Sequence, residues 1–137
     1  MEVFKGSQFV GKDVICHVDF IPYLKLMNSK AKDLGLKIHV TSSDRNSSNV
    51  KGAIVEPSKM SNHMVGHAID CNIIDGKEWW NSKKLEEPSG KVLIFIDFCI
   101  SVGIRWGGNF KKVDTVHFDY PLNLKNPKKW HEIYNSK

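Results

Sequence analysis

Hydrophobic and polar positions follow two different periods in the first third of this chain. Between residues 22 and 35 apolar side chains recur near helical spacing and Gly35 supplies a stop, so the pattern predicts an amphipathic helix. Residues 36–43, LKIHVTSS, alternate and are rich in β-branched side chains, which is typical of a strand. Residues 43–52, SDRNSSNVKG, are polar and predict a loop.

The same reading continues through the rest of the chain. Residues 67–74, HAIDCNII, predict a second strand that turns at Asp75 and Gly76. Residues 88–103 predict a buried helix because apolar side chains cover most of its circumference, with a strand as the alternative. Residues 116–121 predict a strand, and residues 126–135 a short C-terminal helix. Helices interspersed with short strands indicate the α+β class.

Composition describes an ordinary globular chain. The 137 residues suit one domain, 1–137, and 41% hydrophobic with 26% charged residues argues against disorder, collagen or a coiled coil. The longest apolar run, residues 92–104, is shorter than the roughly 20 residues that span a bilayer. The first residues contain no apolar stretch of signal-peptide length, so we expect a soluble protein without a visible secretion signal.

The net charge of +5 favours anionic partners such as wall polymers or nucleic acid. The lysines are scattered, however, whereas nucleic-acid binding usually shows a clustered stripe, so a basic soluble surface is the simpler interpretation. Cys16, Cys71 and Cys99 are odd in number and widely spaced, which predicts reduced, buried thiols without a disulfide framework.

The segment SNHMVGHAID, residues 61–70, places His63 and Asp70 within one short stretch. In a straight helix these side chains would lie about 10 Å apart along the axis, too far to share an ion. Gly66 can fold the chain back, so that His63 sits on a loop and Asp70 on the following strand. A catalytic zinc ion takes three protein ligands, and this pair could supply two of them.

The segment DTVHFDY supplies the third candidate ligand, His117. Asp114 should sit on the turn before that strand, where it can lean over the metal, and Gly107 and Gly108 permit a tight approach into the turn. Six histidines in 137 residues also produce chance clusters, so spacing alone leaves both a metal site and structural histidines open.

Three stretches together resemble one family. The pattern S-x-H-x-x-G-x-A-x-D at 61–70 resembles the signature of the zinc peptidases that cleave bacterial peptidoglycan peptides. These are D-alanyl-D-alanine carboxypeptidases, D-Ala-D-Ala dipeptidases and the L-alanyl-D-glutamate endopeptidases of phage endolysins. WGGNFKKVDTVHF at 106–118 resembles the second signature of the endolysin branch, and VTSSDR at 40–45 resembles the strand end that carries an arginine. The matches come in family order.

The resemblance implies a small α+β domain of the hedgehog type, with an antiparallel sheet and helices packed on one side. It implies one zinc ion per chain, bound by His63, Asp70 and His117. The expected partner is a peptidoglycan peptide, and neither nucleic acid nor a membrane is expected to bind the monomer. An enzyme that acts on the wall would be secreted, periplasmic or released at lysis.

The resemblance also implies individual roles. Asp114 matches the catalytic acid/base, and Arg45 matches the arginine that orients substrate or stabilises the developing oxyanion. Ser61 matches a serine near the polar groups of the substrate, and His67 is either a solvent-facing neighbour or a substrate contact. Because a fully hydrated carboxylate is a weak base, either partial burial strengthens Asp114 or the metal does most of the activation.

The second signature favours an L-alanyl-D-glutamate endopeptidase over a D-Ala-D-Ala carboxypeptidase. The rivals are a non-catalytic zinc-containing binding module, as in hedgehog signalling domains, and a basic nucleic-acid binder; the presence of Asp114 and Arg45 favours catalysis over the first. Trp79 and Trp80 are expected to pack in the core or a lid, with sugar stacking as the alternative. Structural roles are expected for the remaining histidines, His17, His39 and His131.

Overall fold

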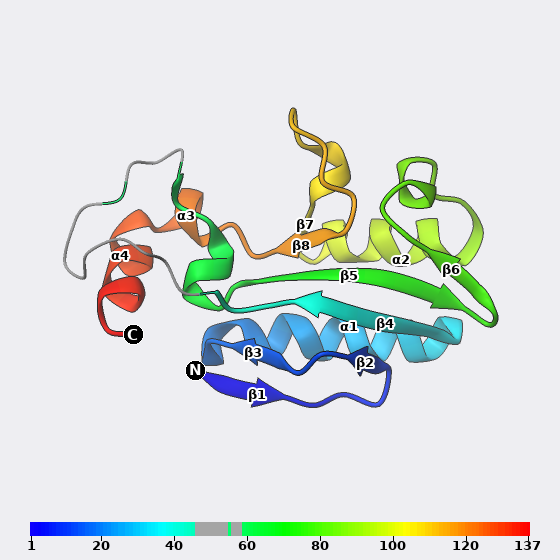
Figure 1. The fold of residues 1–137 in the computed structure, drawn as a ribbon, viewed down its shortest axis with the longest axis horizontal. Helices are drawn as coiled ribbons and strands as arrows, with labels where there is room; N and C mark the ends of the chain where they lie inside the picture. The colour runs from blue at the N-terminus through cyan, green and yellow to red at the C-terminus, as the bar shows by residue number, and fades with distance from the viewer. Residues whose placement is uncertain (46–54, 56–58) are drawn as a thin grey trace.

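A mixed six-stranded sheet forms the centre of the protein (Figure 1). The computed structural model describes residues 1–45, 55 and 59–137. The strands of this sheet run in the order β2-β4-β5-β8-β7, and β6 pairs with β5. Their bounds are β2 Phe9–Gly11, β4 Leu36–Ser42, β5 Ala68–Asp75, β6 Glu78–Trp80, β7 Arg105–Trp106 and β8 His117–Asp119. A separate antiparallel pair joins β1 Glu2–Phe4 to β3 Val14–Cys16.

Two long helices lie side by side on one face of the sheet (Figure 1). The helices are α1 Ile21–Leu34, α2 Gly90–Ser101, α3 Leu122–Lys125 and α4 Pro127–Asn135, and the short 3-10 turns are η1 Val18–Phe20, η3 Asn62–Val65, η4 Lys84–Glu86 and η5 Gly107–Asn109. In α1, Pro22 opens the first turn and Gly35 closes the last one at φ 70°, so the predicted start and stop are both confirmed.

The α+β class and the helices on one side of the sheet are confirmed, but the expectation of an antiparallel sheet is wrong at one edge. There β2 pairs parallel to β4, and α1 lies on the connection between these two strands. Parallel neighbours need such a crossover, and the hydrophobic pattern of residues 22–35 gave no sign of where the preceding strand would pair.

The helix expected over 88–103 forms as α2, so the strand alternative is wrong. Its burial is only partial. Phe95, Ile96 and Cys99 are in the core, whereas Ile94 is 50% exposed. The apolar side chains that surround the whole helix therefore cover the core on one side and meet solvent on the other.

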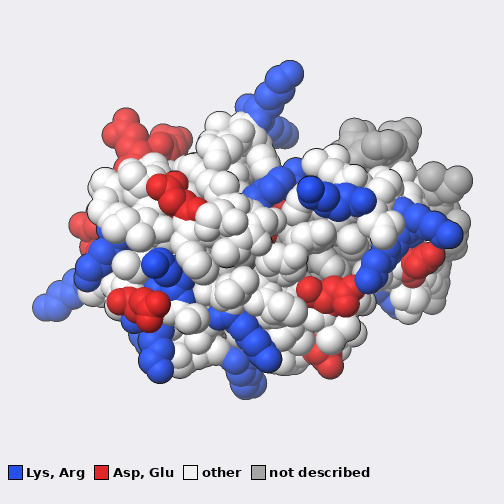
Figure 2. All heavy atoms as spheres, turned by 180° about the vertical axis from the view of Figure 1, so that it is seen from behind, with Lys and Arg blue, Asp and Glu red and all other residues white. Residues whose placement is uncertain are grey.

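The charged side chains are dispersed over the surface. Figure 2 shows lysines and arginines interspersed with acidic residues on the face opposite to that of Figure 1, without a continuous basic stripe there. None of the helices in the described part of the chain has the length and apolar character that crossing a membrane takes.

Candidate metal centre

His63 lies in a tight turn whose geometry its own sequence provides. The Oγ atom of Ser61 accepts a hydrogen bond from the backbone N–H of His63 at 3.2 Å and caps η3. Gly66 closes this turn at φ 65°, a left-handed conformation that favours glycine, and the chain then enters β5. The predicted arrangement, with His63 before the glycine and Asp70 on the strand after it, is confirmed.

The register of the sheet places Asp70 beside His117, the third candidate ligand. Asp70 in β5 and His117 in β8 are direct cross-strand partners, so their side chains leave the sheet side by side. The Oδ1 atom of Asp70 lies 3.1 Å from Nε2 of His63 and 3.4 Å from Nδ1 of His117. The two imidazole nitrogens are 3.2 Å apart. The three side chains that the sequence pattern singled out therefore converge on one point.

In His63 and His117, the ring nitrogen that faces away from Asp70 makes a hydrogen bond, and these bonds show which nitrogen carries the proton. Nδ1 of His63 lies 2.7 Å from the carbonyl oxygen of Ser43, and Nε2 of His117 lies 2.8 Å from Oδ2 of Asp119. Both outer nitrogens must be the donors, because each faces an acceptor. The neutral rings then present lone pairs to each other and to the Asp70 carboxylate. Three acceptors that meet in this way require a cation or a proton between them.

The titration behaviour of the group reflects that requirement. Burial by itself lowers the pKa of His117, but hydrogen bonds to Asp119 and Asp70 outweigh it and raise this pKa to about 9. Burial raises the pKa of Asp70, but the hydrogen bonds from His117 and His63 hold it well below its ordinary range. In the absence of a metal, a proton on His117 thus occupies the position between the acceptors.

The donor set fits zinc. Two imidazole nitrogens and one carboxylate oxygen are ligands that zinc accepts. A tetrahedral ion with bonds of about 2.1 Å holds its ligand atoms roughly 3.4 Å apart. The separations of 3.1, 3.2 and 3.4 Å are close to this value, so little movement is needed to admit the ion.

A buried network around Asp119 supports the centre, and sequence analysis missed it. Asp119 is 1% exposed and accepts hydrogen bonds from Nε and Nη2 of Arg105 at 2.8 and 2.7 Å, as well as the bond from His117. Asn62, next to His63, donates from Nδ2 to Asp119 at 3.0 Å. The Asp119 carboxylate thus connects the turn that carries His63 to the strand that carries His117. The signal available in the sequence was the i, i+2 spacing of His117 and Asp119, which puts both on one face of a strand.

A bulge in β4 directs the next segment toward the centre. Val40 pairs with Cys71 and Ser42 with Asp70, so Thr41 is an extra residue in β4. Beyond it, the carbonyl of Ser43 reaches His63, and Nη2 of Arg45 lies 3.4 Å from Oδ2 of Asp70. The Arg45 side chain is 53% exposed, so its guanidinium is available to a ligand that enters from solvent.

Asp114 lies on the loop before β8, as predicted, and the glycine there is required. The backbone N–H of Asp114 donates to the carbonyl of Gly107 at 2.9 Å, and a Cβ on Gly107 would collide with the Asp114 carbonyl oxygen. The Asp114 side chain is exposed, however, and within the described residues it makes no hydrogen bond to the three ligand side chains. The partial burial considered for Asp114 is therefore not found in this structure.

His67 departs from its solvent-facing interpretation, because its side chain is 1% exposed. Its ring packs against His17, Phe20 and Tyr120 instead. A direct contact with substrate stays a prediction that this burial disfavours. The substrate role of Ser61 also stays a prediction, since its hydroxyl is engaged in capping.

Trp79 and Trp80 lie in different environments. Trp80 is in the core, whereas Trp79 is 51% exposed and packs edge-on against His39. The core role expected for the pair therefore holds for Trp80 alone.

Two imidazoles, a carboxylate and a neighbouring arginine at one end of a sheet form the type of centre found in metal-dependent hydrolases. Residues 55–120, which contain both ligand segments, match a family model described as D-alanyl-D-alanine carboxypeptidase. This segment is similar to that family, in agreement with the resemblance of residues 61–70 and 106–118 to zinc peptidase signatures.

One solved structure, the L-Ala D-Glu endopeptidase ChiX of Serratia marcescens, is similar to 78% of this chain over 81% of its own length, with 17% identity and a TM-score of 0.47. No curated protein sequence matches the chain.

Proposed function

We propose that the protein is a zinc-dependent peptidase that hydrolyses the L-alanyl-D-glutamate bond of peptidoglycan stem peptides. The observation that carries the proposal is the convergence of three lone-pair acceptors, His63 Nε2, Asp70 Oδ1 and His117 Nδ1, on one point. Three protein ligands are what a catalytic zinc site uses, because a position must remain for water or substrate.

His63, Asp70 and His117 would hold the ion. When bound, zinc supplies Lewis acidity toward a peptide carbonyl and lowers the pKa of water to near 7. Asp119 and the Ser43 carbonyl fix the two rings in the tautomer that ligation needs. These contacts are made by residues on three different segments, η3, β8 and the end of β4, so the fold holds the centre in place before any ligand arrives.

Asp114 and Arg45 supply the remaining chemistry in this proposal. The exposed Asp114 carboxylate would accept a proton from the attacking water and return it to the leaving amine. Arg45 would either stabilise the charge that develops on the substrate oxygen or grip a substrate carboxylate. Its backbone is fixed for this task, because its N–H donates to the carbonyl of His63 at 2.9 Å and Lys137 donates to its own carbonyl at 2.9 Å.

Mass spectrometry of digested peptidoglycan tests the proposal. An endopeptidase releases stem peptides with a new amino terminus on D-glutamate, and a chelator should stop that release. Asp114→Ala should retain zinc and lose at least about a hundredfold in turnover, while Asp97→Ala, an exposed aspartate on α2, should act as wild type. Wild-type cutting by the Asp114 variant would show that this residue has another role.

The second candidate is a D-Ala-D-Ala carboxypeptidase, favoured by the description of the matching family. The same digestion separates the two activities, because a carboxypeptidase releases free D-alanine and leaves the L-alanyl-D-glutamate bond intact. The endolysin-like segment at residues 106–118 is the reason for ranking the endopeptidase first. If zinc binds but neither product forms, the remaining explanation is a zinc-containing binding module.

A further inference from the structure

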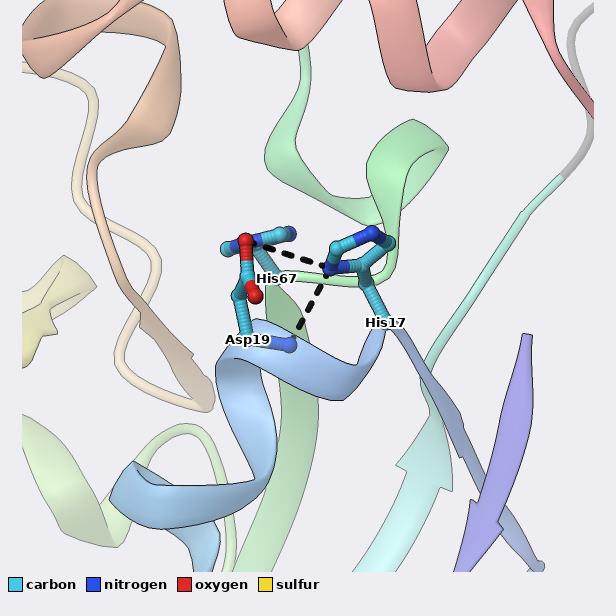
Figure 3. A group of neighbouring side chains, drawn as sticks. All are labelled: His17, Asp19 and His67. Carbon is cyan, nitrogen blue, oxygen red and sulfur yellow. Dashed lines mark hydrogen bonds and ion pairs between the residues drawn. The ribbon is translucent and has the colours of Figure 1, made fainter.

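A second group of metal-ligating side chains lies outside the centre described above. His17 follows β3, Asp19 is in η1, and His67 immediately precedes β5 (Figure 3). One ligand atom from each of the three lies within 4.8 Å of the others. The sequence offered no sign of the group, because His17 and His67 are fifty positions apart.

Backbone contacts bring the two histidines together. The N–H of His17 donates to the carbonyl of Gly66 at 3.0 Å, and a Cβ on Gly66 would collide with that same nitrogen. The rings of His17 and His67 then stack with their centroids 5.2 Å apart and an angle of 25° between their planes. The close approach of the chain at Gly66 is therefore what creates the group.

Hydrogen bonds fix which nitrogen of each ring carries a lone pair. Nδ1 of His67 lies 2.7 Å from the carbonyl oxygen of Val65, so it is the donor and Nε2 carries the lone pair. Nδ1 of His17 lies 3.6 Å from Oδ2 of Asp19, and its lone pair accepts the backbone N–H of Asp19 at 3.1 Å, a hydrogen bond that a bound ion would replace. Burial lowers the pKa of both histidines, which favours the unprotonated rings that ligation requires.

A cation already sits on the carboxylate of this group. Nζ of Lys129 lies 2.5 Å from Oδ2 of Asp19, and the lysine side chain is 43% exposed. An exposed lysine on a flexible stem can turn back into solvent, so a divalent ion can replace it. Asp19, His67 and Lys129 also line a surface cavity of about 470 Å³, which leaves space for an ion and its water ligands.

We propose that His17, Asp19 and His67 bind a second divalent transition-metal ion of the zinc type. Two imidazoles and one carboxylate suit zinc, nickel or copper better than magnesium or calcium, which prefer oxygen ligands alone. The ion would join the β3–η1 segment to the segment between His63 and Asp70, and so act as a structural clamp on the neighbouring centre. We expect it to be the weaker of the two sites, because Nδ1 of His17 and Oδ2 of Asp19 are 3.6 Å apart, farther than any pair in the first group.

A zinc titration of the metal-stripped protein, followed by native mass spectrometry and calorimetry, tests this site. The wild-type chain should bind two equivalents. His17→Ala should bind one, and Asp19→Asn, which keeps the shape of the side chain, should also lose the weaker equivalent. His39→Ala removes a histidine that belongs to neither group and should retain both.

Two further variants make the test specific. Lys129→Ala removes the competing cation and should tighten the weaker equivalent about tenfold. His63→Ala should lose the tighter equivalent and keep the weaker one, whether or not the protein is a peptidase. Three results would overturn the proposal. The wild type could bind only one equivalent of zinc, and His17→Ala could still bind it. The wild type could bind two equivalents that His17→Ala both retains, or Lys129→Ala could bind zinc more weakly than the wild type.

Discussion

Nε2 of His117 donates a hydrogen bond of 2.8 Å to Oδ2 of Asp119, its neighbour two residues along β8. The same carboxylate receives the paired hydrogen bonds of Arg105. A residue outside the metal group thus fixes both the tautomer and the orientation of one of its ligands.

Asp119→Asn should weaken zinc binding about 10- to 100-fold, because the amide can no longer hold His117 as strongly as a carboxylate does. The change also leaves the Arg105 guanidinium without its partner and should cost about 1–3 kcal/mol in the free energy of unfolding. Competition with a chromogenic chelator measures the affinity, and urea unfolding measures the stability. Arg105→Gln serves as the comparison, since it should lower stability with a much smaller effect on zinc. Equal zinc affinities for the wild type and Asp119→Asn would contradict this assignment.

Arg45→Gln should reduce kcat/KM by about a hundredfold without loss of zinc, the magnitude typical of one lost stabilising donor. The kinetic split distinguishes its two possible roles. A fall in kcat indicates stabilisation of developing charge, whereas a rise in KM that disappears with an amidated substrate indicates a grip on a carboxylate. If the planar guanidinium with its two parallel donors is needed, Arg45→Lys should recover less than half of the transition-state stabilisation that Arg45→Gln loses. Unchanged kinetics in both variants would remove Arg45 from the site.

Gly66→Ala and Gly76→Ala form a matched pair. Both glycines have left-handed backbones, φ 65° and 61°, but a Cβ at Gly66 would strike the backbone of His17, whereas at Gly76 nothing lies within 4 Å. Gly76→Ala should cost about 1 kcal/mol of stability from backbone strain alone. Gly66→Ala should cost at least about 2–3 kcal/mol and lower zinc affinity, because the turn that carries His63 must shift. Equal costs in urea unfolding would show that the contact with His17 is not tight.

The stability of the metal-free protein should fall as the pH rises above neutrality. The pKa of His117 in the folded chain is raised from 6.5 to about 9, so its contribution is complete below 6.5 and is lost as the pH rises through about 9. Zinc needs the unprotonated ring, so the stabilisation that it adds should grow over the same interval. Urea unfolding with and without zinc at several pH values measures both trends. His117→Gln should flatten the metal-free trend, and a metal-free trend of the opposite sign would refute the assigned protonation state.

The parts of the site that sequence reasoning found are those encoded locally. Gly66 between His63 and Asp70 indicates a turn followed by a strand, and the α1 helix is bounded by Pro22 and Gly35, whose backbone preferences do not depend on the rest of the fold. These features could be read because each depends on residues a few positions apart.

The parts that it missed depend on contacts between distant segments. The burial of His67 results from contact with His17, and the hydrogen bond that orients His63 goes to the backbone of Ser43, where any residue would supply the carbonyl. The exposure of Asp114 depends on how the loop after Gly107 closes against the sheet. The parallel edge formed by β2 was hidden for the same reason, since its partner β4 lies beyond a whole helix.

The extra residue at Thr41 has a consequence for how much the length of this strand can vary. Before it, the even-numbered side chains of β4 point into the core; after it, the odd-numbered Ser43 is buried. Deleting Thr41 would restore a regular ladder and remove the bend that the bulge introduces, so the chain would leave β4 toward Arg45 in a different direction. The number of residues in this segment, and not only their identity, thus sets how the chain reaches the three ligand side chains, and swapping this strand end between homologues would have to preserve that number.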